Sequence, residues 1–258
     1  MVIRSIREHV VELNWLAVAI DLAIVVVGVF LGTQANNWNE ARIERATAAD
    51  YRVQIIDDLK ENEADLQSRQ NYYTLVRSHA LAALAAIEAP ARPRGPTFLI
   101  DAYQASQVWL RPMNRTGYDE MTSAGFTHSI GNRQTRSRLT NYYTQLRQFD
   151  VTAANTTTYR ERVRRALPYD VQLAIRESCG ERLKTLPSGA QFATFPEQCS
   201  PRLNPAVASL ALSRLQAAEL GDDLTRHIAD LDQKLSGFDR YKRLAHDIRL
   251  FLEAQDRY

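Results

Sequence analysis

This sequence of 258 residues has almost no excess of charge of either sign, since 32 basic and 30 acidic residues give a formal net charge of +2. A surface that binds nucleic acid needs clustered basic charge, so we expect no nucleic-acid partner. Lysine is scarce as well. It occurs four times, and the abundant arginine and alanine are typical of a GC-rich genome rather than of a binding surface.

The sequence also lacks the short motifs that carry common chemistries. It contains no phosphate loop, no dinucleotide-binding fingerprint and no His-Glu-x-x-His zinc motif. Ser123-Ala124-Gly125 is not a nucleophile elbow, because the Gly-x-Ser-x-Gly pattern is absent. We therefore predict no catalytic residues, no metal site and no cofactor, and we favour a non-enzymatic protein over an enzyme.

Cysteine occurs twice, as Cys179 and Cys199, in a Pro- and Gly-containing stretch, 179–205, that predicts a loop. Neither Cys-x-x-Cys spacing nor a Cys/His cluster indicates zinc. A disulfide between the two would close a loop of about 20 residues and stabilise the fold by roughly 3 kcal/mol. Such bonds persist in oxidising compartments, for example the bacterial periplasm, and two unrelated thiols are the alternative.

The sequence has one long apolar run, Trp15 to Ala35, which is long enough to cross about 30 Å of hydrocarbon as a helix. Eleven Leu, Ile, Val or Phe residues between Leu16 and Leu31 contribute roughly −5 kcal/mol to insertion. Asp21 opposes insertion by less than about 3 kcal/mol, because it lies toward one end. The run therefore predicts a transmembrane helix over 15–35.

A cleaved signal peptide is an alternative for this run, with Thr33-Gln34-Ala35 as a weak cleavage site. The leader, however, also contains Glu8 and Glu12, the apolar core contains an acid, and apolar helix-forming sequence resumes soon afterwards. A buried helix of a soluble protein is the other alternative. We favour a retained anchor.

Basic residues flank the run on both sides, so the positive-inside rule barely decides the orientation. The cysteine pair favours an oxidising compartment for the carboxy-terminal part. We therefore expect a protein of the bacterial inner membrane, with a cytoplasmic segment at 1–14 and a periplasmic helical domain at 36–258.

Small residues and the acid share one face of the predicted span. Gly28 and Gly32 form a Gly-x-x-x-Gly pair, which lets two helices approach closely in lipid. An acid on that face would be sheltered in a helix–helix contact, so we expect a homo-oligomer or other membrane proteins as partners. Alternatively, Asp21 lies near the interface and the glycines are incidental. The predicted stripe is Ala17, Asp21, Val25, Gly28, Gly32 and Ala35.

A polar box follows the span. Its tryptophan suits the aromatic belt at a membrane interface, and its asparagines suit a helix that leaves lipid with solvated polar groups. Binding of lipid headgroups or of a partner's loop is the alternative to simple anchoring. The box consists of Asn36, Asn37, Trp38, Asn39 and Glu40.

The remaining sequence predicts an all-α body, an antiparallel bundle of long helices. We expect no strand long enough to affect the fold. We expect the first helix of the body to run to about residue 89, and it could be continuous with the anchor. Its apolar row at three-four spacing is Ile55, Leu59, Leu66, Tyr73, Val76, Ala80, Leu84 and Ile87. Further helices are expected at about 97–110, 118–123, 132–167, 205–220 and 222–254.

Three weaker clusters have simple structural interpretations. Asp57, Glu61 and Asp65 stand four residues apart and could bind a divalent cation, but such a row usually forms a solvated face. Charge runs also mostly face water, so the cluster Arg160, Arg162, Arg164 and Arg165 is expected to be exposed rather than to bind an anionic lipid or polymer. Tyr118, Tyr142 and Tyr143 are expected to pack between helices.

Two segments resemble an uncharacterised family of bacterial single-pass membrane proteins. The first is the acid-bearing apolar helix that runs into Asn36-Asn37-Trp38-Asn39-Glu40. The second is Tyr118-Asp119-Glu120-Met121 with Ser123-Ala124-Gly125 and, further on, Tyr142-Tyr143. The resemblance covers about the first 150 residues and implies an anchored helical domain, but it supplies no activity.

Three functions follow in order of preference. The first is a membrane-anchored periplasmic scaffold or interaction protein. The second is an accessory subunit of an ion-coupled membrane complex that uses Asp21, because a lone span with an acid and a periplasmic domain is also the layout of stator and Ton-type energy-transducing subunits. The third is a periplasmic ligand-binding or enzymatic helical domain.

Overall fold

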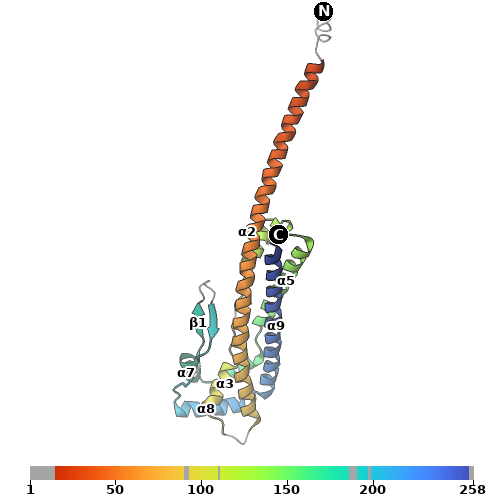
Figure 1. The fold of residues 1–258 in the computed structure, drawn as a ribbon. Helices are drawn as coiled ribbons and strands as arrows, with labels where there is room; N and C mark the ends of the chain where they lie inside the picture. The colour runs from red at the N-terminus through yellow and green to blue at the C-terminus, as the bar shows by residue number, and fades with distance from the viewer. Residues whose placement is uncertain (1–14, 90–92, 110, 186–190, 197–198, 256–258) are drawn as a thin grey trace, which may run out of the picture. The chain divides into compact units, whose positions relative to one another are not determined.

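The computed structural model describes residues 15–89, 93–109, 111–185, 191–196 and 199–255 (Figure 1). The predicted cytoplasmic segment, 1–14, lies outside the described residues. The chain divides into two compact units, Met1–Tyr51 and Arg52–Tyr258, and the second is called the body below.

The all-α class is confirmed, because helices make up most of the described chain. One small hairpin interrupts them, in which β1 pairs antiparallel with β2 from Arg182 opposite Thr194 to Thr185 opposite Gln191. The elements are α2 (Trp15–Glu88), α3 (Pro96–Gln104), α4 (Thr116–Ser123), η1 (Phe126–His128), α5 (Arg133–Ala154), α6 (Thr158–Ala166), α7 (Tyr169–Cys179), β1 (Arg182–Thr185), β2 (Gln191–Thr194), α8 (Pro205–Ala217) and α9 (Gly221–Gln255).

The core of the body forms where the apolar faces of its long helices meet. The part of α2 within the body lies beside α9, and α5 contacts α9 along its length (Figure 1). Tyr73 of α2 stacks on Phe238 of α9 with 5.3 Å between ring centroids. Most of the predicted apolar row of α2 is fully buried, as are Leu224, Leu231, Phe238, Ala245 and Leu252 of α9.

Helix boundaries follow from capping residues. The side chain of Asn132 accepts a hydrogen bond from the backbone N–H of Thr135 and so begins α5, as the sequence predicts. Asn204 caps α8 in the same way, and Pro205 occupies the first turn, where its missing N–H has no helical partner to lose.

Two sequence predictions for the body were wrong in detail. The helix expected over 132–167 is two helices, because Asn155 adopts an extended conformation after α5 and α6 begins at Thr158. The stretch expected to be a loop instead begins at the end of α7 and contains β1 and β2. The sequence did not predict α7, which begins directly after Pro168.

Candidate functional site

The first part of α2 is apolar on all sides. Among the helices of the described chain, only α2 is long and apolar enough to cross a membrane. Ten of the eleven Leu, Ile, Val and Phe residues from Leu16 to Leu31 have 42 to 64% of their surface exposed. Apolar side chains with this degree of exposure make the stretch 18–31 a candidate contact surface for lipid or for another helix.

The predicted stripe lies on this exposed stretch. Asp21, Val25, Gly28, Gly32 and Ala35 follow one another at helical spacing in α2 and are exposed. A Cβ placed on either Gly28 or Gly32 would have no atom within 4 Å, so this face is open in the described chain. Ala17 belongs to α2, but its side chain lies outside the described residues.

The polar box continues the same helix rather than ending it. Asn36 donates from Nδ2 to Oε1 of Glu40 over 2.7 Å, and Arg42 donates to Oδ1 of Asn39 over 3.4 Å. Trp38 is 66% exposed. The polar side chains therefore satisfy one another along the helix surface, while the indole ring stays available for an interface.

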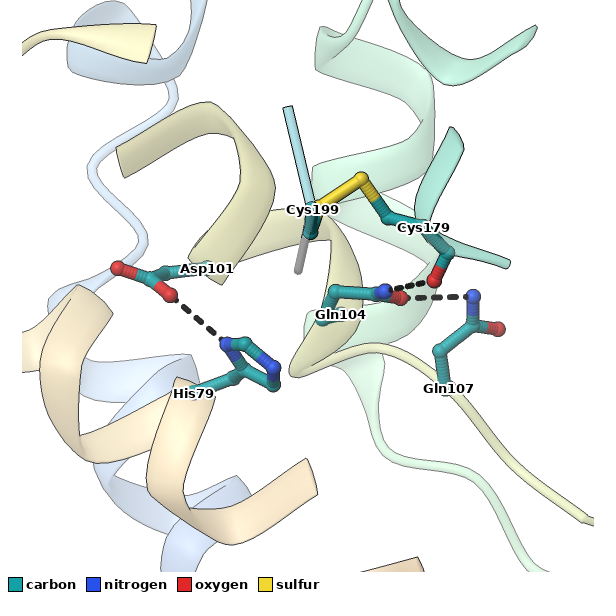
Figure 2. Close-up of a disulfide and its surroundings, with 6 residues drawn as sticks. All are labelled: His79, Asp101, Gln104, Gln107, Cys179 and Cys199. Carbon is teal, nitrogen blue, oxygen red and sulfur yellow. Dashed lines mark hydrogen bonds and ion pairs between the residues drawn. A yellow bond between two sulfur atoms is a disulfide. The ribbon is translucent and has the colours of Figure 1, made fainter. Parts of the chain in front are cut away.

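The predicted disulfide between Cys179 and Cys199 is present (Figure 2). The Cα atoms are 4.9 Å apart, and Cys179 is fully buried. Gln104 of α3 donates from Nε2 to the carbonyl oxygen of Cys179, and Gln107 donates to Oε1 of Gln104 (Figure 2). These buried amides fix the end of α7, and with it the disulfide, to the end of α3.

The segment closed by the disulfide packs on the aromatic face of α2. Tyr72 stacks on Phe195 with 5.0 Å between centroids and donates a hydrogen bond to Glu181. Burial, followed by the charge of Glu181, raises the pKa of Tyr72 far above its usual range, so its hydroxyl remains a donor. The segments that flank the hairpin are thus held to α2 by the ring contact of Phe195 and by the hydrogen bond to Glu181, while the disulfide joins them to each other.

A histidine and an acid form a pair that the sequence did not suggest. Nδ1 of His79 on α2 lies 2.8 Å from Oδ1 of Asp101 on α3, as Figure 2 shows. The ring of His79 also meets the edge of Phe195, with centroids 6.4 Å apart. The pair joins α2 to α3 beside the disulfide-closed segment, and no spacing rule connects residues so far apart in the sequence.

The acidic row on α2 is not a solvated face, contrary to expectation. Asp57 is exposed and pairs with Lys60, but Glu61 accepts a hydrogen bond from Nδ2 of Asn114 over 2.6 Å. Asp65 is buried and forms an ion pair with Arg69 over 2.9 Å. Within the described residues no group of three or more acidic, histidine or cysteine side chains is arranged to hold a metal ion.

The neighbouring acid, Asp58, joins α2 to α4. Its Oδ2 accepts a hydrogen bond of 2.7 Å from the backbone N–H of Gly117, in the first turn of α4. A Cβ on Gly117 would lie 3.0 Å from Cβ of Gln54, so glycine allows this close approach to α2. Burial raises the pKa of Asp58 to about 6, although the hydrogen bond from Gly117 lowers it.

The tyrosines of the family-like segments pack together, as expected. Tyr118 stacks on Tyr143 with 4.3 Å between ring centroids, and Tyr142 meets Tyr143 edge to face at 4.9 Å. Arg115 donates to Asp119 and to the carbonyl oxygen of Tyr143. The hydrogen bond from Arg115 lowers the pKa of Asp119. Two segments about 20 residues apart in the sequence are therefore one cluster in the body.

The arginine cluster was expected to face water, and for three of its four members this was wrong. Arg160 donates to the carbonyl oxygen of Ser106, and Arg164 donates to Oγ of Ser106 over 3.1 Å. Arg162 donates to Asp223 and to the carbonyl oxygen of Ala218. Only Arg165 is exposed. The cluster joins α6 to the end of α3 and the start of α9.

The buried histidine of α9 also serves packing. Nε2 of His227 lies 2.7 Å from the carbonyl oxygen of Ala105, and Nδ1 lies 2.7 Å from Oγ1 of Thr157. Burial lowers the pKa of His227 and so favours the neutral ring. Its Nε2 then donates to the carbonyl, while Nδ1 accepts from the threonine.

Comparison with known proteins identifies no relative. No protein-family model matches the chain, and no curated protein and no solved structure is significantly similar to it. The resemblance to a family of single-pass membrane proteins therefore stays a prediction.

Proposed function

We propose that this chain is a single-pass, membrane-anchored interaction protein without catalytic activity. Residues 15–35 would lie in the bacterial inner membrane, with 1–14 in the cytoplasm and 36–258 in the periplasm. The body would act as a scaffold, and the stripe from Ala17 to Ala35 would bind a second copy of the chain or another membrane protein.

The observation that carries this proposal is the exposure of the apolar stretch 18–31. Ten large apolar side chains at 42 to 64% exposure would be costly in water, and burial in hydrocarbon removes that cost. The same environment makes the exposed carboxyl of Asp21 costly unless another helix shelters it. The open face at Gly28 and Gly32 offers the close approach that such shelter requires.

The polar side chains of the body support a scaffold rather than a reaction centre. Asp58, His79, Arg164 and His227 each bond to a neighbouring helix or its terminus. Bonds of this kind hold helices in one arrangement, and a fixed surface is what an interaction protein presents to a partner. The disulfide supports a location in an oxidising compartment.

The first experiment is a tagged purification of the full-length protein in mild detergent, with the mass and composition of the intact complex measured. We expect a homo-oligomer or co-purified membrane proteins. The double variant Gly28→Leu with Gly32→Leu should lose that association. The matched control, Val26→Leu with Phe30→Leu, changes the opposite face of the same helix and should keep it. A monomeric wild-type protein without partners would contradict the proposal.

The compartment needs its own test. Alkaline phosphatase is active only where its own disulfides form, so a fusion after residue 258 should be active in cells and a fusion before residue 1 should not. The reverse pattern would place the body in the cytoplasm and would leave the anchoring proposal intact.

A second function rests on the exposed carboxyl of Asp21. In an ion-coupled complex this group would carry a proton beside a multi-span partner. Asp21→Asn keeps the size of the side chain and removes its titration. Loss of function in this variant, with unchanged insertion and abundance, would favour the ion-coupled subunit, whereas full function would rule it out.

A further inference from the structure

A hollow of about 350 Å³ lies between α5 and α9 in the body. Phe149 of α5 and Tyr241 of α9 form part of its wall, with their rings stacked at 4.6 Å between centroids. Gly237 lets the two helices approach here, because a Cβ at that position would collide with the ring of Phe149. The size lies within the range of about 300 to 1,000 Å³ that is usual for small-molecule sites.

The charged side chains that line this hollow have a net charge of +1. Asp230 and Lys234 lie 3.0 Å apart as an ion pair, so their charges offset each other. Lys234 is buried and also donates to the carbonyl oxygen of Asn155 over 2.7 Å, at the end of α5. The third charged residue is Arg240, which is exposed at the edge of the hollow.

Arg240 has hydrogen-bonding capacity to spare. Its two hydrogen bonds, to Oε1 of Gln145 at 3.4 Å and to the hydroxyl of Tyr241 at 3.2 Å, both leave from Nη2. A guanidinium has five N–H groups, and it binds a carboxylate best through two parallel hydrogen bonds. The group also lies over the ring of Tyr241, 5.0 Å from the centroid, which holds it beside the aromatic wall.

We propose that this hollow binds a small organic carboxylate with an aromatic or other apolar body. Arg240 would hold the carboxylate through Nη1 and Nη2, with the carboxylate replacing the long hydrogen bond from Nη2 to Gln145. The wall at Phe149 and Tyr241 would contact the apolar body. Gln233 and Ser236 line the same hollow, and their side chains would supply further hydrogen bonds. The site is independent of the membrane anchor and adds ligand binding to the proposed scaffold.

The test uses full-length protein in mild detergent and two fluorinated probes, 4-fluorobenzoate and 4-fluorobenzamide, followed by fluorine NMR. The probes share a ring and differ in charge. We expect saturable binding of the benzoate with a dissociation constant of about 0.1 to 5 mM, and binding of the benzamide that is at least about tenfold weaker, because a charged hydrogen bond is replaced by a neutral one. Detergent without protein measures partition into micelles.

Three variants locate the binding. Arg240→Gln should weaken benzoate binding about tenfold or more and leave benzamide binding unchanged. Arg243→Gln is the matched control, since Arg243 lies on the same helix, pairs with Asp239 and does not line the hollow. Ser236→Trp should fill the hollow and abolish binding of both probes. Equal binding of the two probes, or equal losses in the two arginine variants, would overturn the proposal.

Discussion

The two parts of α2 contain similar apolar side chains but differ in what covers them. Leu31 is 60% exposed, whereas Leu59 in the same helix is completely buried. Over 18–31 the apolar residues surround the helix, while after Tyr51 they form one row at three-four spacing. A helix that is apolar on all sides needs an apolar environment, and a helix with one apolar row needs other helices on that side only.

The acidic residues of the two parts also differ in whether other side chains cover them. Asp65 is buried and paired with Arg69, whose Nη2 also donates to the carbonyl oxygen of Arg111. Asp21 is exposed in the apolar stretch. An acid in an apolar environment needs a partner, and for Asp65 the next turn of the same helix supplies one. For Asp21 the partner would come from another chain, which is the basis of the proposed association.

The largest predicted effect comes from removing Arg69, the partner of Asp65. Arg69→Met leaves the carboxylate of Asp65 buried and uncompensated, and should lower the free energy of unfolding of the body by about 3 to 5 kcal/mol. Urea unfolding of the full-length protein in detergent, followed by circular dichroism, measures the change. Arg77 lies on the same helix as Arg69, and Arg77→Met breaks a more exposed pair with Asp232 of α9, which should cost less than about 1 kcal/mol. Equal losses would show that Asp65 is solvated.

The second prediction compares two leucines of α2. Leu59→Ala removes a fully buried side chain and should destabilise the body by about 2 to 5 kcal/mol, because a cavity remains. Leu31→Ala should leave body unfolding unchanged within about 0.5 kcal/mol. The same urea experiment measures both. A large loss for Leu31→Ala would mean that the apolar stretch packs against the body.

The third prediction concerns Asp58 and pH. Its pKa of about 6 in the folded chain exceeds the ordinary value of 3.8, so the folded state holds the proton more tightly than the unfolded state. This stabilisation is fully present below about pH 4 and is lost as the pH rises through about 6. In the wild type, the unfolding free energy should therefore fall by about 2 to 3 kcal/mol between pH 4 and pH 7 because of this group. Asp58→Asn should abolish that fall.

Asp57→Asn is the control for this experiment. Asp57 is the preceding residue, but its side chain is mostly exposed and pairs with Lys60. Chemical unfolding at several pH values should give the same pH profile for this variant as for the wild type. If Asp58→Asn also kept the wild-type profile, the carboxyl of Asp58 would not be the group that titrates.

Helical periodicity predicted the parts of the fold that depend on local sequence. The apolar row of α2, the helix start near residue 132 and the end of the first helix near residue 89 all follow from local patterns, and the structure confirms them. The break after Ala154 was missed, and one contact at this point comes from a distant part of the sequence. Lys234 of α9 bonds to the carbonyl oxygen of Asn155 and so stabilises the end of α5.

Charged residues were the least predictable part of the body. Charge runs normally face water, yet Arg160 and Arg164 bond to Ser106, which is more than 50 residues away. Likewise, Asp58 could not be distinguished from Asp57 without knowledge of where Gly117 lies. That the stripe residues follow one another on a single helix could be read from their spacing, whereas the hollow at Arg240 needs two helices to be placed side by side.

The smallest predicted effect tests the polar box in the exposed part of α2. Asn36→Ala removes an exposed hydrogen bond to Glu40 one turn away, and should change helix stability by less than about 0.5 kcal/mol. The amount of protein in the membrane fraction and the mass of the complex should then stay at wild-type values. If the box only anchors the helix at the interface, Trp38→Ala should change membrane association more than Asn36→Ala does. A complex that dissociates in Asn36→Ala would instead mean that a partner binds this amide, since the loss of one exposed bond within a helix could not separate two chains.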